Sequence, residues 1–289
     1  MVVFTGGKTM NVKFLGTAAA EGWPAVFCNC AHCKKAAALG EKDVRTRSQI
    51  LVNDDLLIDL PSDTYLHKLA YGLDLSKVHT LLVTHSHMDH FYPMELSLRG
   101  TYYGREMQSP KLDVYCNEKV KEGYLRAASY EPFEPEVDNA IAWNVMAPFE
   151  SVKSGDYEIY ALKAKHAYGE NALFFLIKQG DKAFMQCNDT GYLYEENFAF
   201  LEKLGVKIDF ISLDCTNGKL SFGKEGTHMG AKECEELVAR LRKCDFVKKD
   251  ARFAVTHFSH NGAMTHGELE RRFAPIGVSV AYDGWEVRL

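Results

Sequence analysis

Residues 85–90 read His-Ser-His-Met-Asp-His, so four side chains that can bind a metal ion lie within six positions. They follow the apolar run TLLVT, which predicts a buried strand. His85 and His87 are two positions apart, and an extended backbone therefore places both imidazoles on the same side. Asp89 and His90 come after the chain turns, and they can point to a second centre nearby. Imidazole and carboxylate ligands together suit zinc, iron or manganese.

One loop cannot complete two metal sites, so the remaining ligands must come from other strand ends. Three residues fit: His166 ends the run YALKAKH, Asp189 ends KAFMQCND and His257 ends FAVTH. Each closes an apolar strand pattern and is followed by small or polar residues. A histidine at a strand end is more often simply solvated, so each residue alone is a weak signal. Together with the first cluster they form the set that two metal ions need.

Three of the eight cysteines, Cys28, Cys30 and Cys33, lie together in the segment CNCAHC. Thiolates are soft ligands that suit zinc, and His32 inside the segment is a candidate fourth ligand. The alternative is three reduced cysteines at the surface. Nothing in the sequence indicates an oxidising compartment, so we predict that the isolated cysteines are buried, reduced thiols. These are Cys116, Cys187, Cys215, Cys234 and Cys244.

His228 stands shortly before the segment AKECEELVARL, which predicts a strong helix. The free N–H groups and the dipole at a helix N-terminus favour anions, so His228 is a candidate for contact with a substrate phosphate. The alternative interpretation is a polar loop that caps the helix.

The composition is that of a globular protein: 289 residues, 46% hydrophobic and 25% charged. The net charge is −5 and the lysines and arginines are scattered, so the basic surface of nucleic-acid-binding proteins is missing. The apolar runs are too short to span a bilayer, and the N-terminus contains no hydrophobic secretory segment. We therefore expect a cytoplasmic protein whose partners include neither a nucleic-acid polymer nor a membrane.

Strand and helix patterns alternate along the chain without a repeat or a linker, which predicts one domain over residues 1–289. Strands are predicted within 11–18, 49–60, 78–85, 112–116, 156–166, 171–189, 207–216, 252–259 and 278–289. Helices are predicted at 63–73, 118–129, 231–243 and 266–274. The segment 171–189 predicts a hairpin that turns at residues 179–181. Hairpins mixed with separate helices predict antiparallel or mixed sheets with the helices outside.

At these residues the chain resembles the metallo-β-lactamase superfamily, because HSHMDH matches its His-x-His-x-Asp-His signature at every position. The resemblance spans almost the whole chain and implies an α+β fold, a four-layer αββα sandwich with the metals at one edge. Asp59 in LLIDLPSD is similar to the first motif of the family, which implies a supporting aspartate. The resemblance implies that Asp189 bridges two metals, one held by His85, His87 and His166, the other by Asp89, His90 and His257.

The segment GTAAAEGWPAVFCNCAHC is similar to the branch that contains the cyclic phosphodiesterase of the carbon–phosphorus lyase pathway. That resemblance implies a structural zinc on Cys28, Cys30 and Cys33, completed by His260, three residues after the last metal-binding histidine. Related phosphodiesterases place a Gly-x-His-Met segment over the substrate phosphate, which implies that His228 contacts the leaving oxygen. Residues 1–9 precede MNVKFLGTA, which looks like a natural start for this family, so we interpret them as an extension.

The leading hypothesis is a phosphodiesterase that uses two divalent metals, zinc or manganese with iron as an alternative, and a bridging hydroxide. Asp89 and His228 would be its catalytic residues, and a small cyclic phosphodiester its substrate. The alternatives are an ester, thioester or lactone hydrolase, an iron redox protein, and a non-catalytic binding protein of cofactor biosynthesis. Di-iron relatives usually replace the second histidine of the motif with glutamate, so His87 argues against a redox role. A homodimer stays an open alternative, as does the role of residues 91–149.

Overall fold

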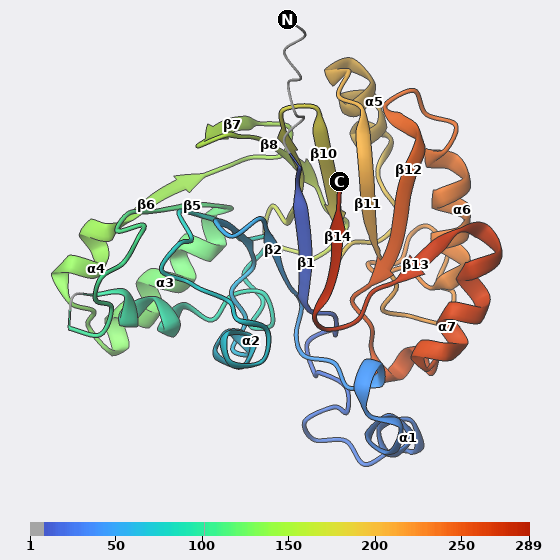
Figure 1. The fold of residues 1–289 in the computed structure, drawn as a ribbon, viewed down its shortest axis with the longest axis horizontal. Helices are drawn as coiled ribbons and strands as arrows, with labels where there is room; N and C mark the ends of the chain where they lie inside the picture. Colours follow the sequence, from blue (N-terminus) through green and yellow to red (C-terminus); the bar gives the residue numbers. More distant parts are fainter. Residues whose placement is uncertain (1–8, 101) are drawn as a thin grey trace, which may run out of the picture.

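The computed structural model describes residues 9–100 and 102–289, and within them two mixed seven-stranded sheets pack face to face (Figure 1). The first sheet has the order β14-β1-β2-β3-β4-β5-β6, with the bounds β1 Asn11–Gly16, β2 Gln49–Val52, β3 Leu56–Ile58, β4 Thr80–Leu82, β5 Leu112–Cys116, β6 Ile141–Val145 and β14 Trp285–Arg288. The second has the order β13-β12-β11-β10-β9-β8-β7, with the bounds β7 Ser151–Ser154, β8 Tyr157–Lys163, β9 Leu173–Gln179, β10 Lys182–Cys187, β11 Ile208–Asp214, β12 Val247–Thr256 and β13 Val278–Val280.

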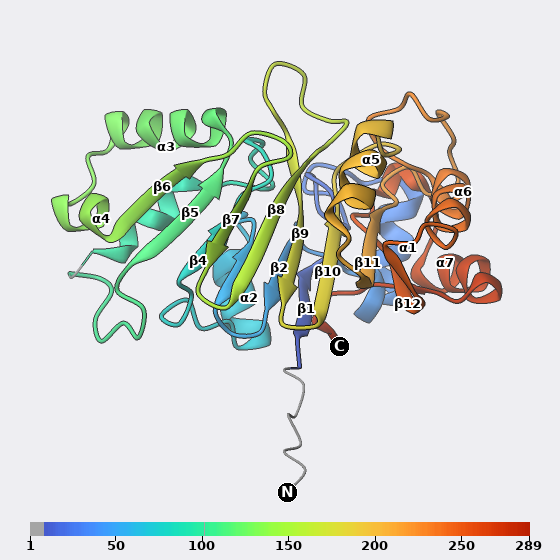
Figure 2. The ribbon, with the colours of Figure 1, turned by 90° about the horizontal axis from the view of Figure 1, so that it is seen from above.

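Helices cover the outer face of each sheet (Figures 1 and 2). The first sheet carries α2 (Thr64–Tyr71), α3 (Glu118–Tyr130), α4 (Pro135–Ala140) and the 3-10 helix η2 (Pro93–Arg99). The second carries α5 (Glu195–Leu204), α6 (Ala231–Leu241) and α7 (His266–Phe273), which the 3-10 helix η4 (Ala274–Ile276) follows. Helix α1 (Ala31–Leu39) contacts the 3-10 helices η1 (Glu41–Asp43) and η3 (His260–Gly262). The predicted αββα sandwich is therefore confirmed.

The alternation of side chains along the strands produces three separate layers of apolar core. In β9, Leu173, Phe175 and Ile177 pack between the sheets, while Phe174 and Leu176 pack under the helices of the second sheet. A third cluster lies between the first sheet and its own helices. A strand buried on both faces shows an unbroken apolar run, and this is why β9 was recognisable from its sequence.

Each of the predicted strands and helices is present, with boundaries shifted by a few residues. The helix predicted at 63–73 is α2, and Asp63 takes its N-cap position without a capping hydrogen bond. The carboxylate of Asp63 instead accepts hydrogen bonds from Arg47. The hairpin of β9 and β10 turns between Gln179 and Lys182, as predicted. Five further elements, α1, α4, α5, β6 and β7, were not predicted from the sequence.

Four of the five isolated cysteines are buried and free, as predicted, and Cys244 is only half-buried. Among the described helices, none combines the length and the apolar character needed to cross a bilayer. The predicted extension at residues 1–9 falls almost entirely on residues 1–8, which lie outside the described part of the chain.

A candidate metal centre at the edge of the two sheets

The predicted metal ligands lie where strands of both sheets end at a common edge. In the second sheet, β10, β11 and β12 run parallel, so their carboxyl ends meet at the same edge. Asp189 follows β10 and His257 follows β12 directly, whereas His166 comes three residues after β8. In the first sheet, the loop that starts at His85 follows β4. The N–H group of Leu173 donates to the carbonyl of Thr84 (2.9 Å) and ties the two sheets together at this edge.

One set of donor atoms comes from His85, His87, His166 and Asp189, whose ligand atoms all lie within 4.8 Å of one another. The Nε2 atoms of His85 and His166 lie 3.1 Å and 3.2 Å from Asp189 Oδ2. The Nε2 atom of His166 lies 3.1 Å from Nδ1 of His87. The structure therefore brings together the four residues that the family resemblance assigns to one metal.

A second set comes from Asp89, His90, His257 and the same Asp189, and all four residues are buried. The Nε2 atom of His90 lies 3.1 Å from Asp189 Oδ2 and 3.2 Å from Asp89 Oδ2. The Nε2 atom of His257 lies 3.3 Å from Nε2 of His90. The carboxylate of Asp189 thus faces both sets.

The outer nitrogens of three histidines donate to fixed acceptors, which sets both the tautomer and the ring orientation. Nδ1 of His85 donates to Thr84 Oγ1 (3.0 Å), and Nδ1 of His90 donates to Asp59 Oδ2 (2.7 Å). Nδ1 of His257 donates to Thr216 Oγ1 (2.8 Å). In each case the opposite ring nitrogen, Nε2, faces the cluster. Asp59, predicted as a supporting aspartate, takes this position against His90.

The donor atoms are better suited to bind divalent cations than to form hydrogen bonds with one another. Nε2 of His85 and Oδ1 of Asp189 are buried and form no hydrogen bond, although Nδ1 of His228 lies 3.1 Å from Oδ1 of Asp189. Unpaired buried polar atoms are costly, and a cation between them would compensate both. Neutral imidazole and ionised carboxylate in two sets that share one carboxylate are the donors that a pair of divalent transition metals requires. The clusters therefore fit a dinuclear metal site.

The protonation states also suit metal binding. Burial lowers the pKa of His85 to about 3 and that of His166 to about 4, so both imidazoles are neutral at physiological pH. Burial opposes ionisation of Asp189, but the neighbouring His257 and His85 outweigh it and hold the pKa of Asp189 well below its usual range. For His90, burial is outweighed by Asp89 and Asp59, which raise its pKa well above the ordinary value. A cation would replace the proton that His90 holds.

Three residues at this edge have a left-handed backbone that non-glycine residues seldom adopt. The φ angles are +66° at Asp59, +52° at Asp189 and +60° at His257. Each such residue costs roughly 1–3 kcal/mol, so the surrounding structure must hold it in place. The turn out of each strand lets the side chain point along the edge rather than into a sheet face.

His228 lies beside these donor sets, and Asp214 lies behind it. Nδ1 of His228 donates to Asp214 Oδ2 (3.1 Å) and is also 3.1 Å from Asp189 Oδ1. Burial alone would favour the neutral imidazole, but the charge of Asp214 outweighs it and raises the pKa of His228 to about 9. Asp214 was not among the predicted site residues, although it ends the apolar strand β11 just as Asp189 follows β10. Asp189, Asp214, His228 and His257 also form a further group with ligand atoms within 4.8 Å.

Glu170 is a second residue that the sequence analysis missed. Its carboxylate accepts from the backbone N–H (3.1 Å) and the hydroxyl (2.8 Å) of Ser86, the residue between His85 and His87. It also accepts from Nδ2 of Asn117 (2.8 Å), the N-cap of α3. Glu170 therefore fixes the loop that carries the first two histidines. No local pattern marks it, because its partners are distant in the sequence.

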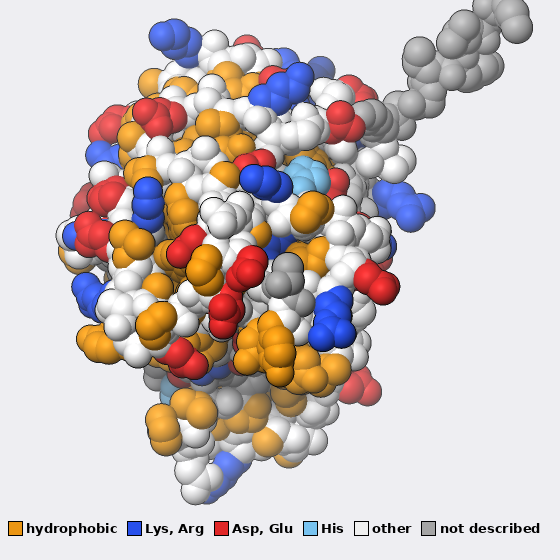
Figure 3. Space-filling model, turned by 90° about the vertical axis from the view of Figure 1, so that its left-hand side faces the viewer, with side chains coloured by type: hydrophobic (Ala, Val, Ile, Leu, Met, Phe, Trp, Pro, Cys, Tyr) orange, Lys and Arg blue, Asp and Glu red, His pale blue; other side chains and the backbone are white. Residues whose placement is uncertain are grey.

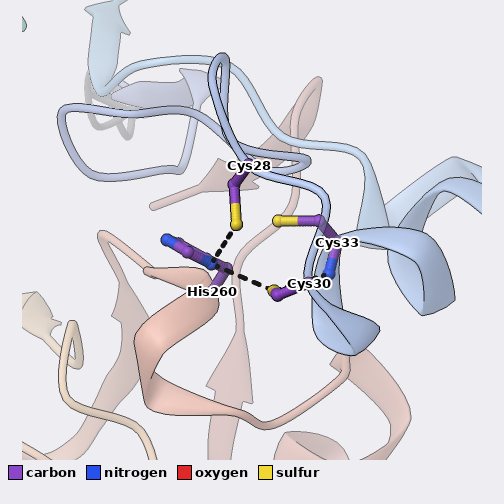
Figure 4. Close-up of side chains that lie close together, drawn as sticks. All are labelled: Cys28, Cys30, Cys33 and His260. Atoms are coloured by element: carbon purple, nitrogen blue, oxygen red, sulfur yellow. Dashed lines mark hydrogen bonds between the residues drawn. The ribbon is translucent and has the colours of Figure 1, made fainter.

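The cysteine segment forms a separate cluster near the same edge (Figure 4). Cys28, Cys30, Cys33 and His260 have ligand atoms within 4.8 Å of one another, and Nδ1 of His260 is 3.6 Å from Cys28 Sγ and 3.5 Å from Cys30 Sγ. The hydrogen bonds of Cys30 with His260 and with the N–H of Cys33 lower the pKa of Cys30 to about 6, so a thiolate is available at neutral pH. His32, the rival ligand, is exposed and is not in this group.

Replacing Asp59 with alanine is expected to weaken metal binding or turnover by about 10–100-fold, because Nδ1 of His90 would lose the acceptor that orients its ring. Titration of the metal-free protein with Zn²⁺ or Mn²⁺ would measure the change. Asp54→Ala is the matched control, since Asp54 is exposed and pairs only with Lys77 at the surface. An Asp59→Ala variant with the affinity and turnover of the control would contradict this role.

Comparisons with known proteins agree with this architecture. Residues 57–258 match the family model described as the beta-lactamase superfamily domain. No curated protein sequence matches the chain. A diphosphatase of the PhnP family has a TM-score of 0.73 at 19% identity, and the match covers 98% of each chain. Zn²⁺-bound PqqB from Methylobacterium extorquens has a TM-score of 0.68 at 18% identity, covering 96% of this chain and 100% of that one. The short form of human tRNase Z has a TM-score of 0.66 at 17% identity, covering 96% of this chain and 98% of that one.

Proposed function

The chain belongs to the beta-lactamase superfamily, and we propose that it is a phosphodiesterase that uses two divalent metals to hydrolyse a small, cyclic or activated phosphodiester. The observation that carries this proposal is the pair of donor sets that share the carboxylate of Asp189. Membership of the superfamily by itself supports only the coarser conclusion, a metal-dependent hydrolase.

When bound, two cations would supply Lewis acidity for an attacking water and for the phosphate oxygens. The chain holds the donors rigidly, since the outer nitrogens of His85, His90 and His257 are tied to neighbouring side chains. We assign the proton chemistry to His228. Its Nδ1 donates to Asp214, so the opposite nitrogen, Nε2, is free to give a proton to a leaving oxygen.

Phosphodiester chemistry gains most from two metals, because both the attacking and the leaving oxygen need stabilisation. Two of the similar structures support this choice by their descriptions, a diphosphatase and a tRNase. The net charge of −5 and the scattered lysines and arginines favour a small substrate over a polymer for this chain.

A hydrolysis screen with the Zn²⁺- and Mn²⁺-loaded protein tests the proposal. We expect turnover of bis-p-nitrophenyl phosphate and of a 2′,3′-cyclic nucleotide, and little turnover of p-nitrophenyl acetate or a lactone. Faster hydrolysis of the ester or the lactone would move the assignment to carboxylic ester chemistry. If the metal-loaded protein hydrolysed neither class of substrate, the result would favour the alternative of a non-catalytic binding protein.

We also propose that Cys28, Cys30, Cys33 and His260 hold a structural zinc. Three sulfurs and one nitrogen form a closed four-ligand set, and such a set leaves no position open for a substrate. The site joins the segment before α1 to η3, which follows the strand end of His257 (Figure 4). A zinc there would hold this part of the edge in place.

Cys30→Ser should lower the thermal unfolding midpoint by on the order of 5 °C, because a metal that binds only the folded chain stabilises it. Turnover of the molecules that remain folded should change little. Differential scanning calorimetry, zinc analysis and kinetics at low temperature would separate the two effects. Cys244→Ser is the control, because Cys244 is half-buried and lies outside the cluster. Equal zinc content and equal midpoints for the two variants would refute the site.

A further inference from the structure

A cavity of about 440 Å³ lies on the outer side of the first sheet, away from the metal donors. Its walls come from the sheet, from α2, from η2 and from residues 103–107. The deepest part is apolar, since Leu57, Leu81 and Leu112 are almost completely buried. Hydrophobic side chains are exposed between charged ones on the side of the molecule that carries α3 and α4 (Figure 3). The volume lies within the range of small-molecule sites.

The charged residues that line this cavity are not balanced. Lys68, Arg99 and Arg105 are cationic, and Glu95 is the only acidic residue among the lining residues that the structure describes. This excess of positive charge contrasts with the net charge of −5 for the whole chain. Among the described residues, no carboxylate forms an ion pair with Arg99 or Arg105, while Lys68 interacts electrostatically with Asp74.

Arg99 is the residue that indicates an anionic ligand. One of its guanidinium nitrogens, Nη2, donates to the carbonyl of Ser109 (2.5 Å), but Nε is buried and has no hydrogen-bond partner. Burial lowers the pKa of Arg99 to about 10, yet the group stays charged at neutral pH. A partly buried guanidinium without a counter-ion is unfavourable unless a ligand supplies one.

We propose that this cavity binds a medium-chain aliphatic carboxylate, with the tail among the leucines and the carboxylate on Arg99. A small hydrophilic anion is not the preferred ligand, because it would make no hydrophobic contacts with the apolar walls. A purely apolar ligand is not preferred either, because the buried Nε–H of Arg99 would still have no hydrogen-bond acceptor. Arg105 and Lys68 add positive potential at the more exposed end.

This site is distinct from the metal centre but adjoins the chain segment that carries it. The side chain of Leu60 lines the cavity, while its backbone N–H donates to the carbonyl of His90 (2.8 Å). The carbonyl of Leu60 accepts from the N–H of Tyr92 (2.7 Å). A ligand in the cavity would therefore contact a residue whose backbone holds the loop of metal donors.

Isothermal titration of the metal-loaded full chain with sodium octanoate tests the proposal without use of any enzymatic activity. We expect one saturable site, and binding of octan-1-ol that is about 10–100-fold weaker, because the alcohol lacks the charge that pairs with Arg99. Arg99→Met should weaken octanoate binding by a similar factor. Arg126→Met on the exposed face of α3 is the matched control and should bind like the unchanged protein.

Leu98→Trp provides a second, independent variant, because the half-exposed Leu98 lines the cavity and a larger ring there would fill it. It should abolish octanoate binding while all charges and the thermal unfolding midpoint are retained. No saturable binding of octanoate, or equal binding by both cavity variants and the control, would overturn the proposal. Acetate that binds as tightly as octanoate would also overturn it, since the cavity would then serve only as a general anion site.

Discussion

Replacing Asp189 with alanine is expected to remove at least one of two bound catalytic metals and to lower phosphodiester turnover by on the order of 10⁴-fold or more, as for the loss of one member of a catalytic unit. The reason is geometric, because Oδ2 of Asp189 lies 3.1 Å from Nε2 of His85 and 3.1 Å from Nε2 of His90, one residue from each donor set. No other carboxylate belongs to both sets among the residues that the structure describes. Elemental analysis of the dialysed protein and kinetics with bis-p-nitrophenyl phosphate would measure both effects.

The matched control is Asp181→Ala. Asp181 lies in the turn at the opposite end of β10, where its exposed carboxylate is 3.6 Å from Lys182 Nζ. The Asp181→Ala substitution removes one negative charge from the same hairpin and leaves the donor sets unchanged. Metal content and turnover should therefore stay at the level of the unchanged protein. Full loading with two metals and full activity in Asp189→Ala would show that the shared carboxylate has no bridging role.

Replacing His228 with alanine is expected to lower turnover by about 10²–10⁴-fold on substrates with a poor leaving group, because a general acid is removed. Hydrolysis of a 2′,3′-cyclic nucleotide expels a ribose hydroxyl, which needs a proton. Hydrolysis of bis-p-nitrophenyl phosphate expels p-nitrophenolate, which does not, so this reaction should be largely spared. Steady-state kinetics of His228→Ala and of the unchanged protein on both substrates would give the two losses in turnover. Their ratio decides whether His228 acts as a general acid.

Metal analysis makes this test specific. His228, Asp189, Asp214 and His257 also form a group that could itself hold a cation, and a loss of metal in His228→Ala would assign His228 to that group instead. An equal loss on both substrates at full metal content would indicate a role in binding alone. Asp214→Asn should reproduce the leaving-group dependence, because it removes the negative charge beside Nδ1 that favours the protonated form of His228.

Local chemistry makes the candidate metal ligands recognisable in the amino-acid sequence. The HSHMDH segment contains its own ligands, and His166, Asp189 and His257 each close an apolar strand pattern. Asp214 also closes an apolar strand pattern, but the predicted strand extended to residue 216, so Asp214 lay inside it and not at its end. The structure ends β11 at Asp214. A strand boundary two residues earlier would have placed this carboxylate at the same edge.

Glu170 and the cavity beside Arg99 could not be predicted in this way. Glu170 acts on Ser86, 84 positions away, and on Asn117, 53 positions away. The cavity is formed by side chains from the sheet, α2 and η2, which lie apart in the sequence, so no local pattern marks it. The unpaired Nε of Arg99 is a property of the packed structure, because any arginine in an unfolded chain is solvated.

Ligand chemistry and hydrophobic periodicity are local properties, so the order of amino acids is enough to predict candidate metal ligands and most of the strands and helices. Which strand ends meet depends on how the whole chain packs. Periodicity records that one face of a strand is buried, but it does not name the neighbouring strand, and β1 pairs with β14 at the other end of the chain. The left-handed turns at Asp59, Asp189 and His257 were likewise decided by packing, because aspartate and histidine adopt that conformation only in a minority of cases and the surrounding sheets must hold it.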